Sequence, residues 1–89
     1  MSISITKLSD DVYEMTVSGS ITTIHEVTVT DQSLNDLTEN NVTKTQLLEF
    51  SFTFLLEREP NTSILVSFDI NEISKYFSNY KDKVRQWCG

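Results

Sequence analysis

The chain has 89 residues, of which 38 % are hydrophobic, and seven basic residues stand against thirteen acidic ones, a formal net charge of −6. This length predicts one domain with a small core, because a chain of this size buries only about 60 to 65 % of its unfolded surface. Association with another chain would add to that burial. Five Phe, three Tyr and one Trp beside two Gly and one Pro exclude a repetitive or wholly disordered chain.

The charge is distributed unevenly along the chain. Residues 1–74 contain three basic and twelve acidic residues, a net charge of −9, whereas residues 75–89 contain four basic residues and one acidic residue, a net charge of +3. The basic end can pair with the acidic part within one chain or between chains. An acidic surface also favours a basic partner.

Cysteine content and hydropathy predict a cytoplasmic protein. Cys88 is the only cysteine, so an intrachain disulfide is excluded and a reducing compartment is favoured. The first residues lack the basic and apolar regions of a signal peptide. The longest apolar runs are triplets, so we expect no membrane span.

Alternating apolar and polar residues predict three strands, at about residues 2–8, 11–18 and 21–30. Three-residue loops at 8–10 and 18–20 would pair Ile5 with Tyr13 and Val17 with Ile21. The strands then form an antiparallel meander, with Ile24 as the one apolar residue on the outer face. The expected inward residues are Ile3, Ile5, Tyr13, Met15, Val17, Ile21, Val27 and Val29.

Two helix-start motifs follow the strands. Thr43 and Gln46 have the spacing of a capping box, and Asp69 and Glu72 form a close relative of it. A short helix is predicted before them, capped by Asp31 and ending near residues 40–41.

The helix predicted over residues 44–59 has an unusually wide apolar surface. At about 100° per residue, its apolar positions cover roughly 240° of the helical wheel, more than a helix on a sheet requires. Either it is a central helix with the sheet on one side and the last helix on the other, or another protein covers part of it. In the second case Leu48, Phe52 and Leu55 are the expected contacts. The apolar positions are Leu47, Leu48, Phe50, Phe52, Phe54, Leu55 and Leu56.

The last third of the chain is less regular. Residues 64–68 fit a strand or a helical turn, and the helical turn is preferred because the segment lies between two helices. A helical pattern runs from residue 70 to 87 and has a possible break at Ser78-Asn79. We therefore predict one α+β domain over residues 1–89, with a three-stranded antiparallel meander in residues 1–30. Two to three helices in residues 31–89 would pack on one face of it.

His25 is the only histidine, and general acid-base chemistry near neutral pH would most naturally centre on it. It falls on the inner side of its strand, which favours a hydrogen-bonded core residue with Tyr13 or Thr23 as partner. One histidine and one cysteine do not supply a zinc ligand set, and two isolated glycines do not form a phosphate loop. We therefore predict no metal and no cofactor.

The C-terminal segment interleaves cations with aromatic rings, a pattern typical of nucleic-acid binding. Tyr80 and Trp87, however, share a helical stripe with Phe77 and Val84, which favours packing in the core. The acidic part of the chain would also repel a nucleic acid. The residues concerned are Lys75, Tyr76, Tyr80, Lys81, Lys83, Arg85 and Trp87.

Four segments carry a resemblance to known sequences. They are Ile-His-Glu-Val-Thr-Val at 24–29, Leu-Glu-Phe-Ser-Phe-Thr-Phe-Leu-Leu-Glu-Arg-Glu-Pro at 48–60, Ser-Ile-Leu at 63–65 and Phe-Asp-Ile at 68–70. With these, residues 21–80 resemble a group of short bacterial proteins of unknown function, and the run from Phe54 to Pro60 is the most specific part. The resemblance implies a bacterial cytoplasmic protein and no particular activity. It draws attention to the charged corner at 57–60, which can recognise a partner or, as we favour, anchor the next segment.

Together these features predict a non-catalytic protein-interaction module, either a homodimer or bound to another protein. The alternative is a small-molecule binder or minor enzyme that uses His25 with Tyr13, and nucleic-acid binding through the C-terminal segment comes third. The candidate interface residues are Leu48, Phe52, Leu55, Tyr76, Tyr80 and Trp87.

Overall fold

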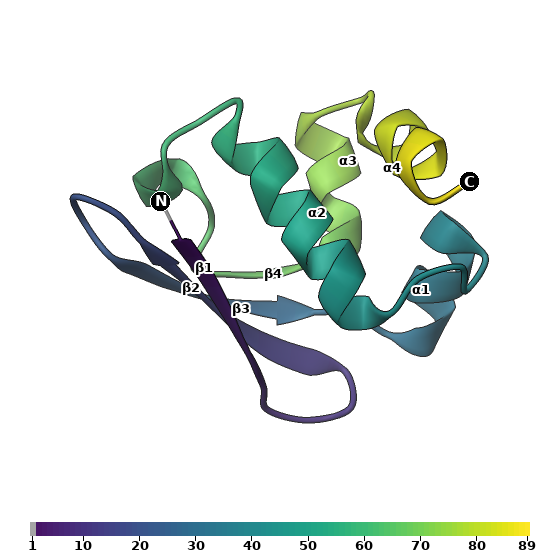
Figure 1. Ribbon diagram of the computed structural model, residues 1–89, viewed down its shortest axis with the longest axis horizontal. Coiled ribbons are helices and arrows are strands. Elements are labelled where there is room, and N and C mark those ends of the chain that lie inside the picture. Colours follow the sequence, from purple (N-terminus) through teal and green to yellow (C-terminus); the bar gives the residue numbers. More distant parts are fainter. Residues whose placement is uncertain (1) are drawn as a thin grey trace.

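The computed structural model describes residues 2–89. It consists of a four-stranded mixed sheet with helices on one face (Figure 1). The fold is α+β, as predicted. Strands β1 (Ser2–Lys7), β2 (Val12–Ser18) and β3 (Thr23–Thr28) form the antiparallel meander, and β4 (Ser67–Asp69) is added beside β3. The strand order is β1-β2-β3-β4.

The register of the meander differs from the prediction by two residues at each loop. Ile5 pairs with Met15, and Val17 pairs with Thr23, so each loop contains two more residues than expected. In the first loop the backbone N–H groups of both Leu8 and Ser9 donate to the Val12 carbonyl. A shift of two keeps each side chain on its predicted face. The exception is Ile21, which falls in the second loop and is 61 % exposed.

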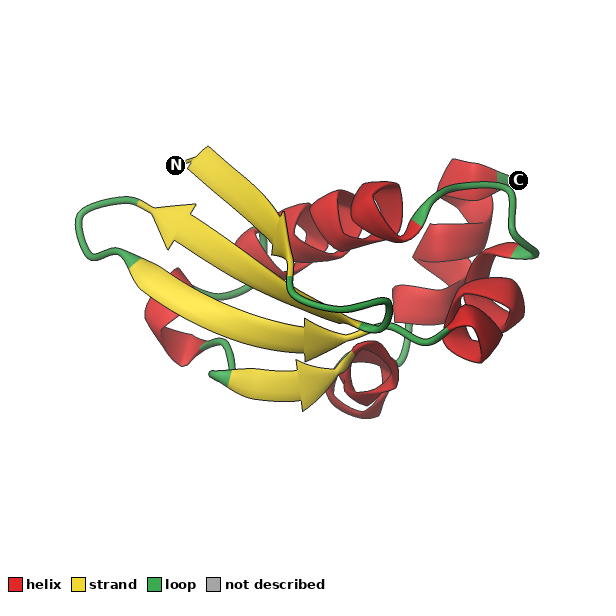
Figure 2. Cartoon of the chain, turned by 90° about the horizontal axis from the view of Figure 1, so that it is seen from below, coloured by secondary structure: helices red, strands yellow, loops and turns green. Residues whose placement is uncertain are grey.

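The preferred prediction for residues 64–68 was wrong, because this segment is extended and leads into β4. Strand β4 pairs in parallel with β3, and the Glu26 N–H donates to the Val66 carbonyl at 2.7 Å (Figure 2). The chain between β3 and β4 makes the long crossover that parallel pairing requires. Pairing with a distant strand, which local sequence does not reveal, settles the conformation here.

The N-cap of helix α1 (Asp31–Thr38) lies one residue earlier than predicted. Thr30 is the N-cap, and its Oγ1 accepts from the Ser33 N–H at 3.1 Å. Asp31 therefore lies inside the helix, where its carboxylate is 2.8 Å from the Lys44 ammonium. The hydrogen bond and charge of Lys44 lower the pKa of the Asp31 carboxyl, and Asp31 in turn raises the pKa of Lys44.

Both predicted capping boxes form. Thr43 and Gln46 close the first one at the start of α2 (Lys44–Leu56), with bonds of 3.2 and 2.9 Å. Helix α2 ends before residue 59, and the 3-10 turn η1 (Asn61–Ser63) follows Pro60. Asp69 and Glu72 close the second box around η2 (Ile70–Glu72).

The last helical pattern breaks where the capping residues predicted. Helix α3 (Ile73–Tyr76) and helix α4 (Tyr80–Cys88) are separated at residues 77–79. Helix α4 lies beside α1 at the end of the molecule away from η1 (Figure 1).

Helix α2 is the centre of the core. On one side Phe52 contacts the His25 ring edge-on, with centroids 5.5 Å apart, and stacks with Phe68 at 6.2 Å. On the other side Phe54 meets Tyr80 at 5.3 Å and Phe77 at 5.7 Å. The chain itself thus covers the wide apolar surface of α2 from two directions, as the first interpretation of that helix required.

Candidate functional site

Four of the six predicted interface residues belong to the core. Leu48, Phe52, Leu55 and Tyr80 are buried. The first three face neighbouring elements because α2 lies between the sheet and the C-terminal helices. In this fold the side chains of Leu48, Phe52 and Tyr80 are covered by the chain itself, which argues against direct contact with a partner.

The other two candidates, Tyr76 and Trp87, are exposed but lie apart. Trp87 stacks on Phe50 with centroids 4.5 Å apart and planes inclined by 16°. One face of its ring is therefore occupied, which leaves less of it for stacking on bases. Tyr76, at the end of α3, is 68 % exposed.

His25 is buried at 1 % exposure, with both ring nitrogens hydrogen-bonded. Its Nδ1 lies 2.7 Å from the Leu65 carbonyl, so Nδ1 carries the proton and donates. In the neutral ring Nε2 then accepts from the Thr23 hydroxyl, 2.8 Å away. Asn61 Nδ2 in turn donates to Thr23 Oγ1 at 3.1 Å and to the Ile21 carbonyl at 2.7 Å.

This network gives His25 a structural role. It holds β3 to η1 and to the extended segment before β4, and no ring nitrogen is left for a substrate. Thr23 is the partner of His25. Tyr13 is also buried but stands opposite Val27 in the register, two pairs along from the pair of His25 with Met15.

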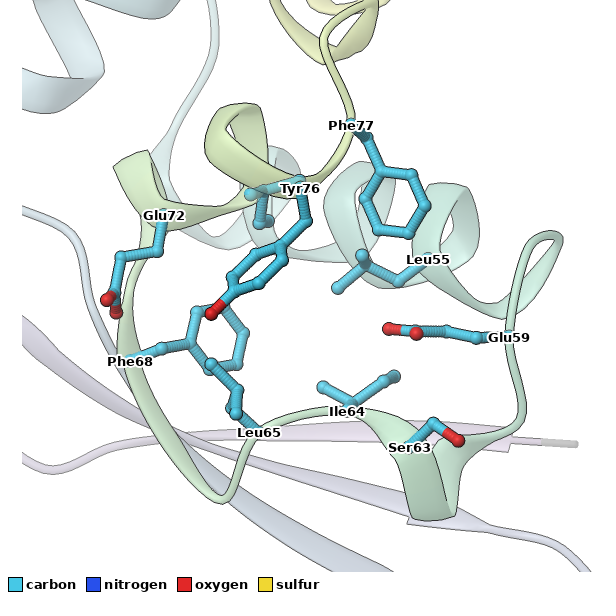
Figure 3. Close-up of a pocket in the computed structure, with 10 residues that line it drawn as sticks. Leu55, Glu59, Ser63, Ile64, Leu65, Phe68, Glu72, Tyr76 and Phe77 are labelled. Carbon is cyan, nitrogen blue, oxygen red and sulfur yellow. The ribbon is translucent and has the colours of Figure 1, made fainter.

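The segment that His25 holds forms one wall of a pocket of about 370 Å³ (Figure 3). The pocket lies between the end of α2, residues 63–68 and helix α3. Its walls are mainly apolar, and the side chains responsible are Leu55, Ile64, Phe68, Ile73 and Phe77. Leu55 is the one predicted α2 contact that reaches it.

Two carboxylates line the same pocket but are placed differently (Figure 3). Glu72 Oε2 accepts from the Asp69 N–H at 3.0 Å, because it closes the capping box of η2. The Glu59 carboxylate points toward the middle of the pocket between Leu55 and Ile64. Within residues 2–89 it has neither a hydrogen bond nor an ion pair.

Exposed apolar side chains continue the pocket onto the surface. Leu65 is 45 % exposed and lines the pocket, and Tyr76 lines it from α3 and is also exposed (Figure 3). Sequence analysis indicated Tyr76 of this rim but missed Leu65. The signal was the apolar triplet at 64–66, since neighbouring residues of an extended segment point in opposite directions and cannot all be buried.

Two other features, a metal site and a membrane-spanning helix, are not found among the described residues. Residues 2–89 contain no group of three His, Cys, Asp or Glu side chains that is placed to hold a metal ion. Among the same residues no helix has the length and apolarity needed to cross a bilayer.

No protein-family model, no curated protein and no solved structure matches the sequence. The bacterial origin implied by the resemblance stays a prediction. The geometry of the pocket and its rim is what bears on function.

Proposed function

We propose that this protein is a non-catalytic protein-interaction module and that it binds its partner at the pocket between α2, residues 63–68 and α3. The observation that carries the proposal is the continuity of apolar surface. Leu65 and Tyr76 belong to the apolar walls of the pocket and continue them onto the surface, where both are exposed. Contiguous apolar surface of this kind is typical of interaction sites.

The form of the surface favours a protein over a small molecule. The pocket, at about 370 Å³, is near the lower end of the range of roughly 300 to 1,000 Å³ for small-molecule sites. A ligand that filled it would leave the rim residues uncovered. A protein segment can place one side chain in the pocket and cover the rim with its neighbours.

The same geometry argues against His25 chemistry as the alternative function. A general acid or base has to come within hydrogen-bond reach of the substrate. His25 lies behind the pocket wall, and its nitrogens are held by Leu65 and Thr23. The interaction hypothesis therefore has the better support.

Selection of random displayed peptides on the purified protein, followed by binding to a Leu65→Glu variant, tests the proposal. We expect selected peptides to bind wild-type protein at least about tenfold more tightly than the variant, because a charge on the rim opposes apolar contact. Ile24→Glu is the matched control, since Ile24 is 55 % exposed on the opposite face of the sheet. Peptides that bind Leu65→Glu as well as wild type would contradict the assigned surface.

The mass of the protein in solution separates the two kinds of partner. Light scattering at low and high concentration should give a monomer if the partner is another protein. A dimer that Leu65→Glu converts to a folded monomer would make the partner a second copy of the chain.

A further inference from the structure

The Glu59 carboxylate in the pocket bears on the chemistry of the partner. We infer that the pocket recognises an apolar side chain with a lysine or arginine directly beside it in a segment of a basic partner protein, and that Glu59 binds the cation. This inference rests on the proposed function and specifies the chemistry of the partner.

The corner at residues 57–60 fixes the direction of Glu59. The N–H groups of Arg58 and Glu59 both donate to the Leu55 carbonyl at 2.9 Å, so the helix end is held tightly. Pro60 then turns the chain into an extended conformation, with φ −69° and ψ 156°. The Glu59 side chain leaves this turn toward the middle of the pocket (Figure 3).

The adjacent cation does not neutralise Glu59. Arg58 donates from Nη1 to the Phe54 carbonyl at 2.8 Å, and its guanidinium lies 3.6 Å from the centre of the Phe54 ring. Its ion-pair partner is Glu57, at 3.7 Å. The corner thus directs Arg58 onto the chain and leaves the Glu59 carboxylate without a cation among the described residues.

The environment of Glu59 is suited to a cation attached to an apolar group. Glu59 is half-buried, and its carboxylate stands between Leu55 and Ile64 (Figure 3). A lysine or arginine there would form a charge-assisted hydrogen bond, which is stronger than a neutral one. The apolar neighbour of that cation would fill the space beside Phe68 and Ile73.

Charge identifies the partner as basic and as a different protein. Residues 1–74 have a net charge of −9, which attracts a basic segment over a distance. Three of the seven cations of the chain itself lie on α4, where the apolar residues Tyr80 and Val84 are buried and Trp87 stacks on Phe50. A second copy exposes an apolar side chain directly beside a cation at Lys7-Leu8 and at Lys75-Tyr76, but its net charge of −6 opposes association with another acidic chain.

Three synthetic peptides test the inference by amide chemical-shift changes in ¹⁵N-labelled protein. The probes are the acetylated amides Gly-Ser-Phe-Lys-Ser-Gly, Gly-Ser-Phe-Gln-Ser-Gly and Gly-Ser-Ser-Lys-Ser-Gly at millimolar concentration. We expect the Phe-Lys peptide to shift amides of residues 64–77 and to bind about tenfold more tightly than either of the others. Glu59→Gln should remove the preference for Phe-Lys over Phe-Gln, and its unchanged spectrum elsewhere would show that it folds.

Glu57→Gln is the matched control, since it removes a carboxylate two residues away that pairs with Arg58. It should keep the preference. Equal binding of Phe-Lys and Phe-Gln, or a preference that survives in Glu59→Gln, would overturn the inference and leave the proposed function standing. Equal binding of Ser-Lys and Phe-Lys would reject the apolar anchor. If no peptide shifts the pocket amides, the pocket is not a peptide site and both proposals fail.

Discussion

Two apolar surfaces of this molecule differ in how far the rest of the chain covers them. Helix α2 carries one of them, and the sheet and the C-terminal helices cover it from two sides. The segment from 64 to 77 carries the other, and there Leu65 and Tyr76 stay exposed around a pocket. The amount of apolar surface on an element therefore does not locate an interface; what matters is whether the same chain can cover it.

The difference has a geometric cause. A helix placed between two layers can bury side chains in most directions. Residues 64–66 form an extended segment at the edge of the sheet, where alternate side chains point away from the core. Ile64 is buried, and the next residue, Leu65, is exposed.

The sharpest test of this comparison is the same substitution on each surface. Phe52→Glu should unfold the protein, because loss of the ring costs about 3 to 5 kcal/mol and burial of an unpaired charge costs several more. The total stability of a chain of this length is only roughly 4 to 13 kcal/mol. Leu65→Glu should change stability by about 0.5 kcal/mol or less.

Urea unfolding followed by circular dichroism measures both variants. A folded Phe52→Glu protein would mean that the α2 surface is covered by something other than the core described above. Strong destabilisation by Leu65→Glu would mean that the rim is packed, and the interaction surface would lose its basis.

The connection between the two surfaces is His25, which touches Phe52 on one side and holds the Leu65 carbonyl on the other. His25→Ala should cost about 3 kcal/mol, because it opens a cavity and leaves a buried carbonyl without a donor. Thr23→Val, which removes the hydrogen bonds of Thr23 Oγ1 with His25 and Asn61 and keeps the ring, should cost only about 1 to 2 kcal/mol.

Amide hydrogen exchange supplies the second measurement on these variants. In His25→Ala, exchange at residues 64–66 should rise more than exchange in β2, since the segment loses its attachment to β3. Uniform acceleration across the sheet would instead show that His25 acts only through global stability.

The parts of the fold that local patterns determine were predictable. The inward residues of the meander follow from a period of two, and both capping boxes follow from side-chain chemistry within four residues. Even the break near Ser78-Asn79 was visible. Each of these features depends on neighbours in the sequence.

The features that failed depend on distant residues. Strand β4 exists because β3 offers it a free edge, and Leu48 and Phe52 are buried because α4 and the sheet approach from opposite sides. Ile21 lies in a loop, and its carbonyl accepts from Asn61, 40 residues away in the sequence. Of the candidate site, the sequence indicated Leu55, Tyr76 and the charged corner at 57–60, but not which way Glu59 points, because that depends on how the chain turns at Pro60.

A smaller effect than that of His25→Ala is expected where α4 packs on α2, at the hydrogen bond of 2.6 Å between Tyr80 and Ser51. Ser51 Oγ donates its one hydrogen to the Leu47 carbonyl at 2.7 Å, so the Tyr80 hydroxyl is the donor to Ser51. Tyr80→Phe should therefore cost about 1 kcal/mol. Leu65→Glu, on the open surface, provides the comparison.

The pH dependence of the Tyr80→Phe variant tests the same burial independently. Burial raises the pKa of the Tyr80 phenol well above its ordinary value of 10.0, against a smaller opposing effect of Ser51. Above pH 10 the Tyr80 phenol therefore keeps its proton in the folded state and loses it in the unfolded state. Its contribution to the free energy of unfolding is complete below pH 10 and declines as the pH rises beyond it. Tyr80→Phe lacks that decline, so its deficit relative to wild type should shrink in urea unfolding above pH 10. A constant deficit would mean that the Tyr80 phenol reaches solvent and that α4 does not close this side of α2.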